Sequence, residues 1–361
     1  MPGIGDAHNL RRVSEPSAHR IRTGTFACDD DRLNRVADAV AVPRPLTDEP
    51  LLAIGVALRD DLLYTGDRAT AAEQLSAARE YVLTQFAVDA RSLVVPAVGA
   101  QSRGDTGGER DRPLLDNVLY FLALDAVGWV ASELGDTTDL HAIEDRLAVV
   151  RSGFLDVFWR GDELRSPGYV GEADEGGHAV ATLANLLPAT HLPAVRDVLA
   201  RKHHTSPPVD SLVVQALFAM GEPAAAIDRL LSGGADARAV LIRHAAGIAP
   251  TAPGYATYRV RPQLGPLRRV NAEAPTPAGP VHVSIERVGS IGATLALDLP
   301  AGVDGQLELP ASWFGADVPA DVRVDGRRPF ALWIEEPTIG RVLAVEVPPG
   351  RHEVTVAGAQ A

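Results

Sequence analysis

Acidic side chains gather beside an arginine in one short segment of the chain. Arg59-Asp60-Asp61 is followed, six residues after Asp61, by Asp67, which comes directly after Tyr64-Thr65-Gly66. Acid/base catalysis on a polar substrate needs a positioned proton donor, and hydrolysis needs a second carboxylate that activates water. We therefore take Asp60 as a candidate proton donor and Asp67 as a candidate second catalytic carboxylate.

The relation between these two aspartates depends on the local helix. Asp67 lies seven positions after Asp60, so a helix that continued through Gly66 would place both carboxylates on one face. Carboxylates that lie close together raise one another's pKa, which favours a protonated acid near neutral pH. The alternative is a solvated helix surface at Asp60-Asp61 and a helix-capping carboxylate at Asp67, since acidic pairs in an acidic chain are usually exposed.

Two kinds of periodicity divide the chain. Apolar residues recur at helical spacing from about Asp29 to about Ala246, and paired helices in series predict a toroid of αα-hairpins. Gly135-Asp136 is expected to end the helix that contains Trp129. After Gly254, short segments such as 281–286 and 342–347 alternate apolar with polar or small residues, which predicts antiparallel strands.

Turn signals separate the expected strands. Asp325-Gly326 is one, and Pro348-Pro349-Gly350 is another, which precedes a closing strand at 352–356. These patterns predict an extended N-terminal segment over 1–26, a helical domain over 27–248 and an antiparallel β-sandwich over 249–361.

Composition excludes several classes of function. The chain has 361 residues, of which 46% are hydrophobic, so it can bury a sizeable core. A formal net charge of -13 disfavours binding to nucleic acids and to anionic membranes. One cysteine, Cys28, permits no internal disulfide, and neither a signal peptide nor a long uninterrupted apolar run is evident, so we expect a cytoplasmic protein.

The junction between helices and strands resembles a known family. Residues 246–255 read Ala-Gly-Ile-Ala-Pro-Thr-Ala-Pro-Gly-Tyr and, with 260–262 and 276–283, resemble the transition into the C-terminal sandwich of bacterial α-L-rhamnosidases of glycoside hydrolase family seventy-eight. The segment 183–188, Leu-Ala-Asn-Leu-Leu-Pro, fits the same family. From about Phe26 onward, this resemblance implies an (α/α) six-hairpin-type barrel, complete or incomplete, followed by a C-terminal antiparallel β-sandwich.

The catalytic motif of that family is present in altered form. The family places an arginine and an acidic residue ahead of Trp-Thr-Gly-Asp, and here Arg59-Asp60 precedes Tyr64-Thr65-Gly66-Asp67. The resemblance implies that Asp60 replaces the general-acid glutamate, with Arg59 and Tyr64 as substrate-binding residues. The family's catalytic base, a glutamate beside a tryptophan, has no counterpart, because no Glu occurs between Pro223 and Pro262. A further aspartate of the family falls on Gly55.

Other side chains are candidates to replace the missing base or to bind a substrate. Glu175, which with Asp174 stands where the family has Asp-Gln, is the candidate catalytic group, and its alternative is a cap on the following helix. Aromatic residues at helical spacing are more often core than sugar platforms, and the adjacent His203 and His204 point in different directions on a helix. The candidate substrate-binding residues beyond Arg59 and Tyr64 are Asp116, Asp174, Trp129 and His204.

Three classes of function remain open. The first is an acid/base enzyme acting on a glycoside or another small polar substrate in the barrel mouth. It includes a repurposed, non-hydrolytic cyclase, lyase or isomerase of small-molecule biosynthesis, because losing the water-activating base suits such chemistry. The second is a catalytically inactive carbohydrate-binding pseudoenzyme, and the third is a structural or interaction protein. We expect no cofactor and no metal, and the sequence leaves the oligomeric state open.

Overall fold

A computed structural model describes residues 24–39, 50–95, 110–201, 207–232, 237–289, 292–314, 321–336 and 338–357. The chain forms two compact units that interleave along the sequence. The first comprises Met1–Ser17, Pro43–Leu62 and Asp67–Ala216, and the second comprises Ala18–Val42, Leu63–Gly66 and Leu217–Ala361. The domain ranges expected from the sequence, 1–26, 27–248 and 249–361, remain predictions, because this grouping of contacts does not test them.

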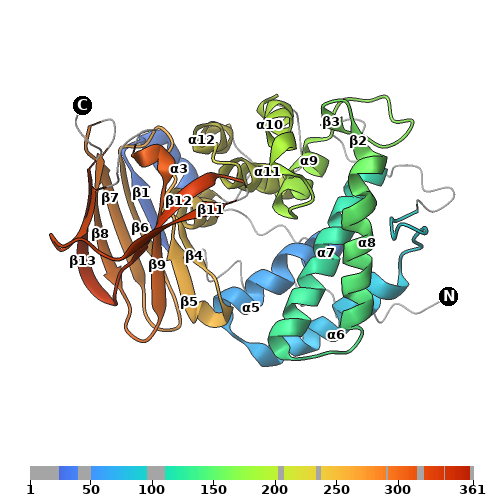
Figure 1. Cartoon of the computed structure of the whole chain (residues 1–361), viewed down its shortest axis with the longest axis horizontal. Helices are drawn as coiled ribbons and strands as arrows, with labels where there is room; N and C mark the ends of the chain where they lie inside the picture. Colours follow the sequence, from blue (N-terminus) through green and yellow to red (C-terminus); the bar gives the residue numbers. More distant parts are fainter. Residues whose placement is uncertain are drawn as a thin grey trace. The chain divides into compact units, whose positions relative to one another are not determined.

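Helices build the described part of the first unit. Helix α4 continues through a π-helical segment, η3, into the start of α5, and α6, α7 and α8 run side by side (Figure 1). A short hairpin of β2 and β3 precedes α9, the 3-10 turn η4, α10 and most of α11. The bounds are α4 Pro50–Ala53, η3 Ile54–Leu58, α5 Arg59–Thr65, α6 Arg68–Thr84, α7 Arg112–Leu134, α8 Leu140–Phe158, β2 Trp159–Arg160, β3 Glu163–Leu164, α9 Glu175–Leu183, η4 Ala189–His191, α10 Leu192–Ala200 and α11 Pro207–Ala219.

Helix α7 is the centre of this unit because apolar side chains surround it. Its middle residues, including Phe121, Leu124 and Val127, are fully buried. Gly135 ends the helix in the left-handed conformation at φ 72°, which confirms the predicted stop. Among the described residues, α7 alone is long and apolar enough to cross a membrane by length and composition, and 78% of its most apolar window is buried inside the structure.

Close packing between η3 and α7 depends on Gly55. A Cβ atom at this position would lie 2.9 Å from Cγ of Leu122 and 3.2 Å from the backbone nitrogen of Ala123. Because a backbone atom cannot move aside as a flexible side chain can, only glycine fits here without a shift of the helices. The aspartate that the resemblance implies at this position would require such a shift.

This packing predicts that Gly55→Ala is destabilising. We expect the free energy of unfolding to fall by about 1–3 kcal/mol, the usual cost of overpacking, when measured by urea denaturation. Gly153→Ala in α8 is the matched control, since the added Cβ would lie 3.7 Å from its nearest neighbour, Cδ of Arg91. Alanine favours helices, so the control should be neutral or slightly stabilising, and equal losses in both variants would contradict the prediction.

Two sheets form most of the second unit. In the described residues the larger sheet has the order β1-β6-β7-β8-β13-β10 and is antiparallel throughout, whereas the smaller has the order β11-β12-β9-β5-β4 and contains one parallel pair, β5 with β9. The strands are β1 Thr25–Cys28, β4 Ile248–Pro250, β5 Thr257–Val260, β6 Arg269–Ala274, β7 Val281–Arg287, β8 Gly292–Leu299, β9 Asp304–Pro310, β10 Asp321–Val324, β11 Ala331–Glu336, β12 Gly340–Glu346 and β13 Gly350–Ala357. The predicted order, mainly α followed by antiparallel β, is confirmed.

The two expected turns have the predicted chemistry. Asp325 and Gly326 both adopt positive φ, 51° and 77°, as a tight hairpin turn requires, and β13 begins at Gly350 after the predicted proline turn. Alternation also holds along β7, where Val281, Val283 and Ile285 are buried and their neighbours are not. This buried face, which the period-two pattern set, forms the core side of the larger sheet.

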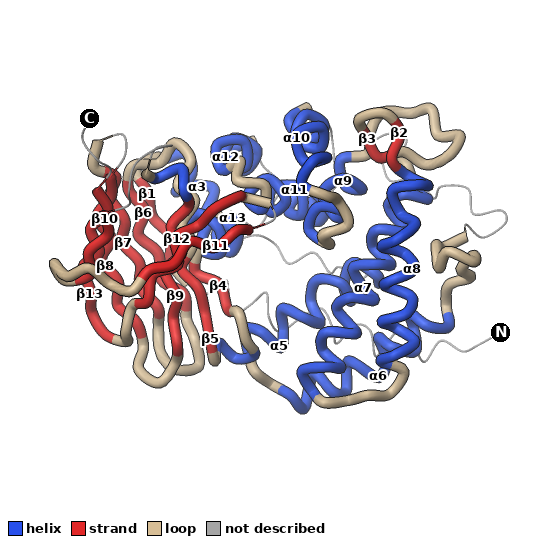
Figure 2. The backbone as a smooth tube through the Cα atoms, in the orientation of Figure 1, coloured by secondary structure: helices blue, strands red, loops and turns tan. Residues whose placement is uncertain are grey.

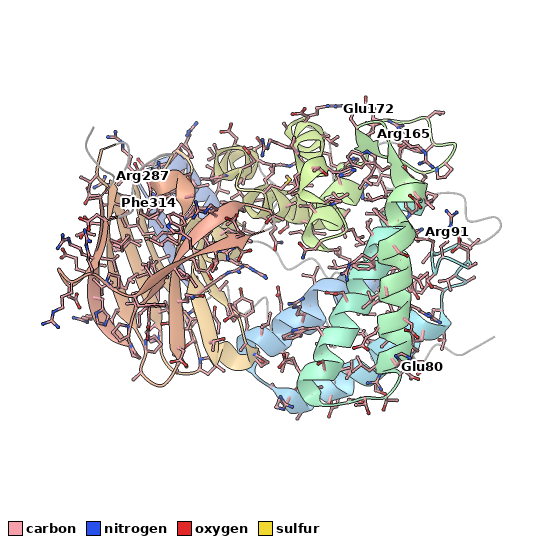
Figure 3. The ribbon with its side chains drawn as sticks, viewed as in Figure 1. Glu80, Arg91, Arg165, Glu172, Arg287 and Phe314 are labelled. Carbon is pink, nitrogen blue, oxygen red and sulfur yellow. The ribbon has the colours of Figure 1, made fainter. Side chains whose placement is uncertain are left out.

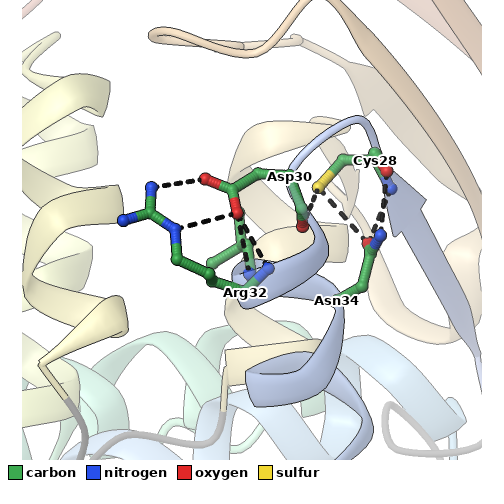
Figure 4. Close-up of polar contacts among 5 residues, drawn as sticks. Cys28, Asp30, Arg32 and Asn34 are labelled. Atoms are coloured by element: carbon green, nitrogen blue, oxygen red, sulfur yellow. Dashed lines mark hydrogen bonds and ion pairs between the residues drawn. The ribbon is translucent and has the colours of Figure 1, made fainter.

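A segment from the start of the chain completes the larger sheet. Strand β1 pairs with β6, Phe26 opposite Ala272, although nearly 250 residues separate them in sequence (Figure 2). Helix α3 (Asp31–Asp38) follows, capped by Asp30, whose carboxylate accepts hydrogen bonds from the backbone N–H groups of Arg32 at 2.8 Å and Leu33 at 3.4 Å (Figure 4). The second unit also contains α12 (Pro223–Leu231), α13 (Ala237–Val240), the π-helical η5 (Leu241–Ala245) and the 3-10 turns η6 (Pro253–Tyr255) and η7 (Ala311–Trp313).

Candidate functional site

Arg59 is held in place by two side chains of α7. Its guanidinium Nη1 lies 3.5 Å from Oδ2 of Asp125, and its Cζ lies 4.7 Å from the ring centroid of Trp129. Asp125 and Trp129 are four residues apart and therefore share one face of the helix. The structure thus brings together two predicted substrate-binding residues, Arg59 and Trp129, and adds Asp125, which the sequence analysis did not single out.

Asp60 follows Arg59 in the first turn of α5 and is half-buried. Its neighbour Asp61 is the more enclosed of the pair, with 5% of its surface exposed. The acidic pair is therefore not the fully solvated helix surface of the alternative interpretation. Ile54, Leu58 and Leu62 are completely buried and pack one face of the α4–η3–α5 segment against the core. This packing explains why the acidic pair is partly enclosed.

Asp67 does not share a helical face with Asp60. Helix α5 ends at Thr65, Gly66 has a φ of 67°, and Asp67 is the N-cap of α6. Its carboxylate accepts hydrogen bonds from the backbone N–H of Thr70 at 3.0 Å and from the Thr70 hydroxyl at 2.8 Å. The shared face required a helix that continued through Gly66, and it does not form, because α5 ends two residues before Asp67; the Asp67 side chain instead caps α6.

Tyr64 lies within the second unit, where residues 64–66 of the catalytic-motif segment contact Gly254 and Tyr255 of the junction segment. Its ring packs edge-on against that of Tyr255, with centroids 5.5 Å apart, and Arg243 lies 6.0 Å from the Tyr64 ring. Gly66 and Gly254 approach so closely that a Cβ on Gly66 would lie 3.0 Å from Cα of Gly254. The cavity beside Tyr64 measures about 10 Å³, roughly the volume that holds one water molecule, so it has no room for a sugar.

Polar groups cluster at the N-termini of α7 and α9. Asp174 is the N-cap of α9, accepting from the backbone N–H of Gly177 at 2.8 Å and of Asp111 at 3.2 Å. Glu175 occupies the first turn of α9 and is 3% exposed. Asp116, one turn into α7, lies 3.4 Å from Nη2 of Arg112.

Asp111 is the most enclosed carboxylate of this cluster, and the sequence analysis missed it. It caps α7 through the backbone N–H of Leu114 at 3.3 Å, and it accepts hydrogen bonds from the backbone N–H of Ser166 at 2.7 Å and from the Ser166 hydroxyl. Its side chain is 1% exposed. The available signal was the Asp-Arg-Pro sequence at 111–113, a capping residue followed by proline in the first helical turn.

His178 also belongs to this cluster, and its hydrogen bonds show that the cluster has a structural role. Its Nε2 accepts the backbone N–H of Leu164 at 2.8 Å, so Nδ1 carries the proton and donates it to the backbone oxygen of Asp174 at 2.7 Å. Because both ring nitrogens are occupied by backbone groups, His178 cannot serve as the base for Ser166. The arrangement therefore lacks the geometry of a Ser-His-Asp triad and instead ties α9 to β3.

The loop between β3 and α9 brings Arg165 and Tyr169 together. The Arg165 guanidinium lies 5.5 Å from the Tyr169 ring centroid and is hydrogen-bonded to Glu163 and to the backbone oxygen of Gly171. Figure 3 labels Arg165 and Glu172, which both belong to this loop. His204, the remaining predicted site residue, lies outside the described residues, and no group of three or more metal-ligating side chains occurs in the part of the chain that the structure describes.

The buried histidines make stability depend on pH. Burial lowers the pKa of His178 in the first unit, and burial together with Arg243 and Arg259 lowers the pKa of His244 well below its usual value in the second. The folded state therefore takes up these protons less readily than the unfolded chain. Stability should be constant above about pH 7 and fall as the pH drops below about 6.5, by at most about 1.4 kcal/mol per pH unit for each histidine.

Urea denaturation between pH 8 and pH 5.5 measures this effect. His178→Gln removes one titrating group and should therefore make the decline of the free energy of unfolding with falling pH less steep. His141→Gln is the control, because His141 is 89% exposed and should leave the slope unchanged. A decline of the same steepness in His178→Gln as in the unmodified chain would show that His178 is not its source.

Comparisons with known proteins place the fold. A family model described as the bacterial alpha-L-rhamnosidase C-terminal domain matches residues 247–315, which contain all but the first residue of the junction identified from the sequence. The solved α-L-rhamnosidase of Streptomyces avermitilis, complexed with L-rhamnose, is 17% identical with a TM-score of 0.62, over 84% of this chain and 32% of that chain. The α-L-rhamnosidase from Dictyoglumus thermophilum is 13% identical with a TM-score of 0.67, over 92% and 50%.

A third solved rhamnosidase has a similar fold. The family seventy-eight rhamnosidase of Bacillus sp. GL1 is 16% identical with a TM-score of 0.61, over 83% of this chain and 44% of that chain. The chain thus spans 32% to 50% of the length of these structures. No curated protein matches it. The chain has a rhamnosidase-like fold, and the predicted resemblance to bacterial α-L-rhamnosidases, in shortened form, is confirmed.

Proposed function

We propose that this protein is an acid/base enzyme acting on a glycoside or another small polar substrate, with Asp60 as the proton donor. In this proposal the helices of the first unit belong to an (α/α) six-hairpin-type barrel, and the sheets of the second unit form a C-terminal β-sandwich. The likeness in fold to three α-L-rhamnosidases supports the architecture. The L-rhamnose bound to one of them supports a carbohydrate as the class of ligand.

The observation that carries the proposal is the arrangement around Arg59. The salt bridge to Asp125 and the ring of Trp129 hold the guanidinium beside Asp60 in sequence, at the start of the same helix. Arginine has five N–H donors, so those not engaged by Asp125 can bind hydroxyl oxygens. A guanidinium fixed in this way could orient a polyol, and Asp60, the next residue of the same helix, could supply a proton to a leaving oxygen.

A second candidate function is non-hydrolytic acid/base catalysis. Two features favour it: a carboxylate at Gly55 would require a shift of the packed helices, and the segment from α13 through η5 to β4 contains no glutamate. Inverting hydrolysis needs a base that activates water, whereas a cyclisation, elimination or isomerisation can proceed from a proton donor with a weaker base. Glu175 stays the candidate replacement base, and a binding-only pseudoenzyme is the third reading.

A panel of aryl α-L-rhamnosides, assayed for aglycone release, tests these functions. Release that is proportional to enzyme concentration would establish hydrolysis. L-rhamnose binding by calorimetry without release would support the pseudoenzyme. Neither release nor binding of rhamnose or of other small polyols would contradict a carbohydrate ligand and leave the non-hydrolytic enzyme as the working hypothesis.

A further inference from the structure

Strand β11 lies at the edge of the smaller sheet. It pairs on one side with β12, Leu332 opposite Ala344 and Ile334 opposite Val342 (Figures 1 and 2). No strand pairs with its other side in the part of the chain that the structure describes. Unpaired strand edges are templates for pairing with another chain.

The alternation of antiparallel hydrogen bonds shows which backbone groups face outward. The backbone N–H of Glu346 donates to the oxygen of Phe330 at 3.3 Å, so even-numbered residues of this strand direct their polar groups toward β12. The N–H and C=O groups of Ala331, Trp333 and Glu335 therefore point away from the sheet. This outer edge offers a ladder of donors and acceptors to a further strand.

The side chains along this edge are unusually apolar. Residues 330–334 read Phe-Ala-Leu-Trp-Ile, and Phe330 and Leu332 are 74% and 57% exposed. Charges or proline within an edge strand disfavour such pairing; here Pro329 precedes the run from Phe330 to Ile334, and the charges of β11, Glu335 and Glu336, lie at its end, so the run itself carries neither. Trp333 makes an edge-on contact with Phe314, at 5.7 Å between ring centroids. The Cζ atom of Arg341 lies 4.8 Å from the centroid of the Trp333 ring. The edge is therefore ordered as well as apolar.

Charges of opposite sign flank the apolar run. Arg327 and Arg328 precede it, and Glu335 and Glu336 end it. The side chains of Arg328 and Glu335 are 77% and 76% exposed. An antiparallel copy of the same strand would place the arginines of one chain beside the glutamates of the other at both ends, whereas a parallel copy would place like charges together.

We propose that β11 pairs antiparallel with β11 of a second copy of this chain, forming a two-fold symmetric dimer with a continuous sheet across the interface. The self-complementary charge order selects the second copy over an unrelated partner. Pairing would cover Phe330 and Leu332 and satisfy the outward backbone groups. The same flanking charges limit the association to one register and disfavour open-ended stacking.

Light scattering coupled to size exclusion, over the micromolar concentration range, tests the proposal. The unmodified chain should show twice the monomer mass at high concentration and dissociate on dilution. Leu332→Lys should weaken the dimer at least tenfold, because it places a charge opposite the apolar Phe330 of the second copy. Val288→Lys is the matched control, since Val288 is 59% exposed but lies outside β11 and should leave the mass unchanged.

A charge exchange tests the antiparallel order. In the register that sets Ala331 opposite its own symmetry mate, Arg327 lies directly opposite Glu335 of the other copy, so Arg327→Glu and Glu335→Arg should each weaken the dimer about tenfold, and the double variant should recover it. The double variant also loses the pair of Glu335 with Arg341 within the chain, so recovery cannot come from that pair. A monomer at every concentration, a dimer unaffected by Leu332→Lys, or a double variant no better than the singles would each overturn the proposal.

Discussion

Asp60→Asn should abolish turnover while leaving the fold intact. An amide cannot release a proton to a leaving oxygen, and the loss of a general acid typically costs about 10²–10⁴-fold in rate. Asparagine has nearly the shape of aspartate, and Asp60 is only half-buried, so the free energy of unfolding should change by less than about 0.5 kcal/mol. The measurement is kcat/KM on whichever substrate the panel identifies, together with urea denaturation.

A matched variant separates catalysis from general charge effects. Asp145→Asn removes a carboxylate from α8 that is 67% exposed and should leave both activity and stability unchanged. The pH profile adds a second criterion, since loss of the acid should remove the basic limb of the rate profile. Unchanged turnover in Asp60→Asn would exclude this residue as the proton donor and, with it, the mechanism proposed for the fold.

Asp111→Ala should cause the largest loss of stability. The substitution removes the acceptor for three donors, the backbone N–H groups of Leu114 and Ser166 and the Ser166 hydroxyl, at a site that is 1% exposed. Each buried donor left without an acceptor costs about 1–3 kcal/mol. We expect the free energy of unfolding to fall by about 3 kcal/mol or more, measured by urea denaturation.

Two further variants define the source of that loss. Ser166→Ala removes the hydroxyl but keeps both backbone donors paired with Asp111, so it should cost only about 1 kcal/mol. Asp145→Ala on the exposed surface of α8 should change stability by less than about 0.5 kcal/mol. A loss below 1 kcal/mol in Asp111→Ala would mean that the carboxylate does not tie α7 to the loop before α9.

Local patterns in the sequence predicted much of the architecture. Helical periodicity and a terminal glycine gave α7 and its end at Gly135, alternation gave strands such as β7 and β12, and the Asp-Gly pair gave the turn at residues 325 and 326. The junction at 246–255 predicted the family resemblance that the match over 247–315 confirms. These features depend on neighbours within a few residues, and therefore the sequence carries them directly.

The candidate site was harder to predict. Arg59 and Trp129 were singled out separately. Their contact, and the salt bridge of Arg59 to Asp125, depend on how the start of α5 packs against α7. The shared face of Asp60 and Asp67 does not form, because Gly66 turns the chain where its backbone meets Gly254, nearly 190 residues later. The role of each carboxylate at the site is a prediction for the variants above to test.

The sequence by itself therefore determined the order of helices and strands, the positions of their caps and turns, and the family that the junction resembles. Only the tertiary structure decided that β1 completes a sheet made mostly of C-terminal strands, that Asp61 is more buried than Asp60, and that Asp111 joins Ser166 across 55 residues of chain. The physical reason is range: caps and periodicity are properties of consecutive residues, whereas burial and long-range hydrogen bonds depend on which distant segments pack together.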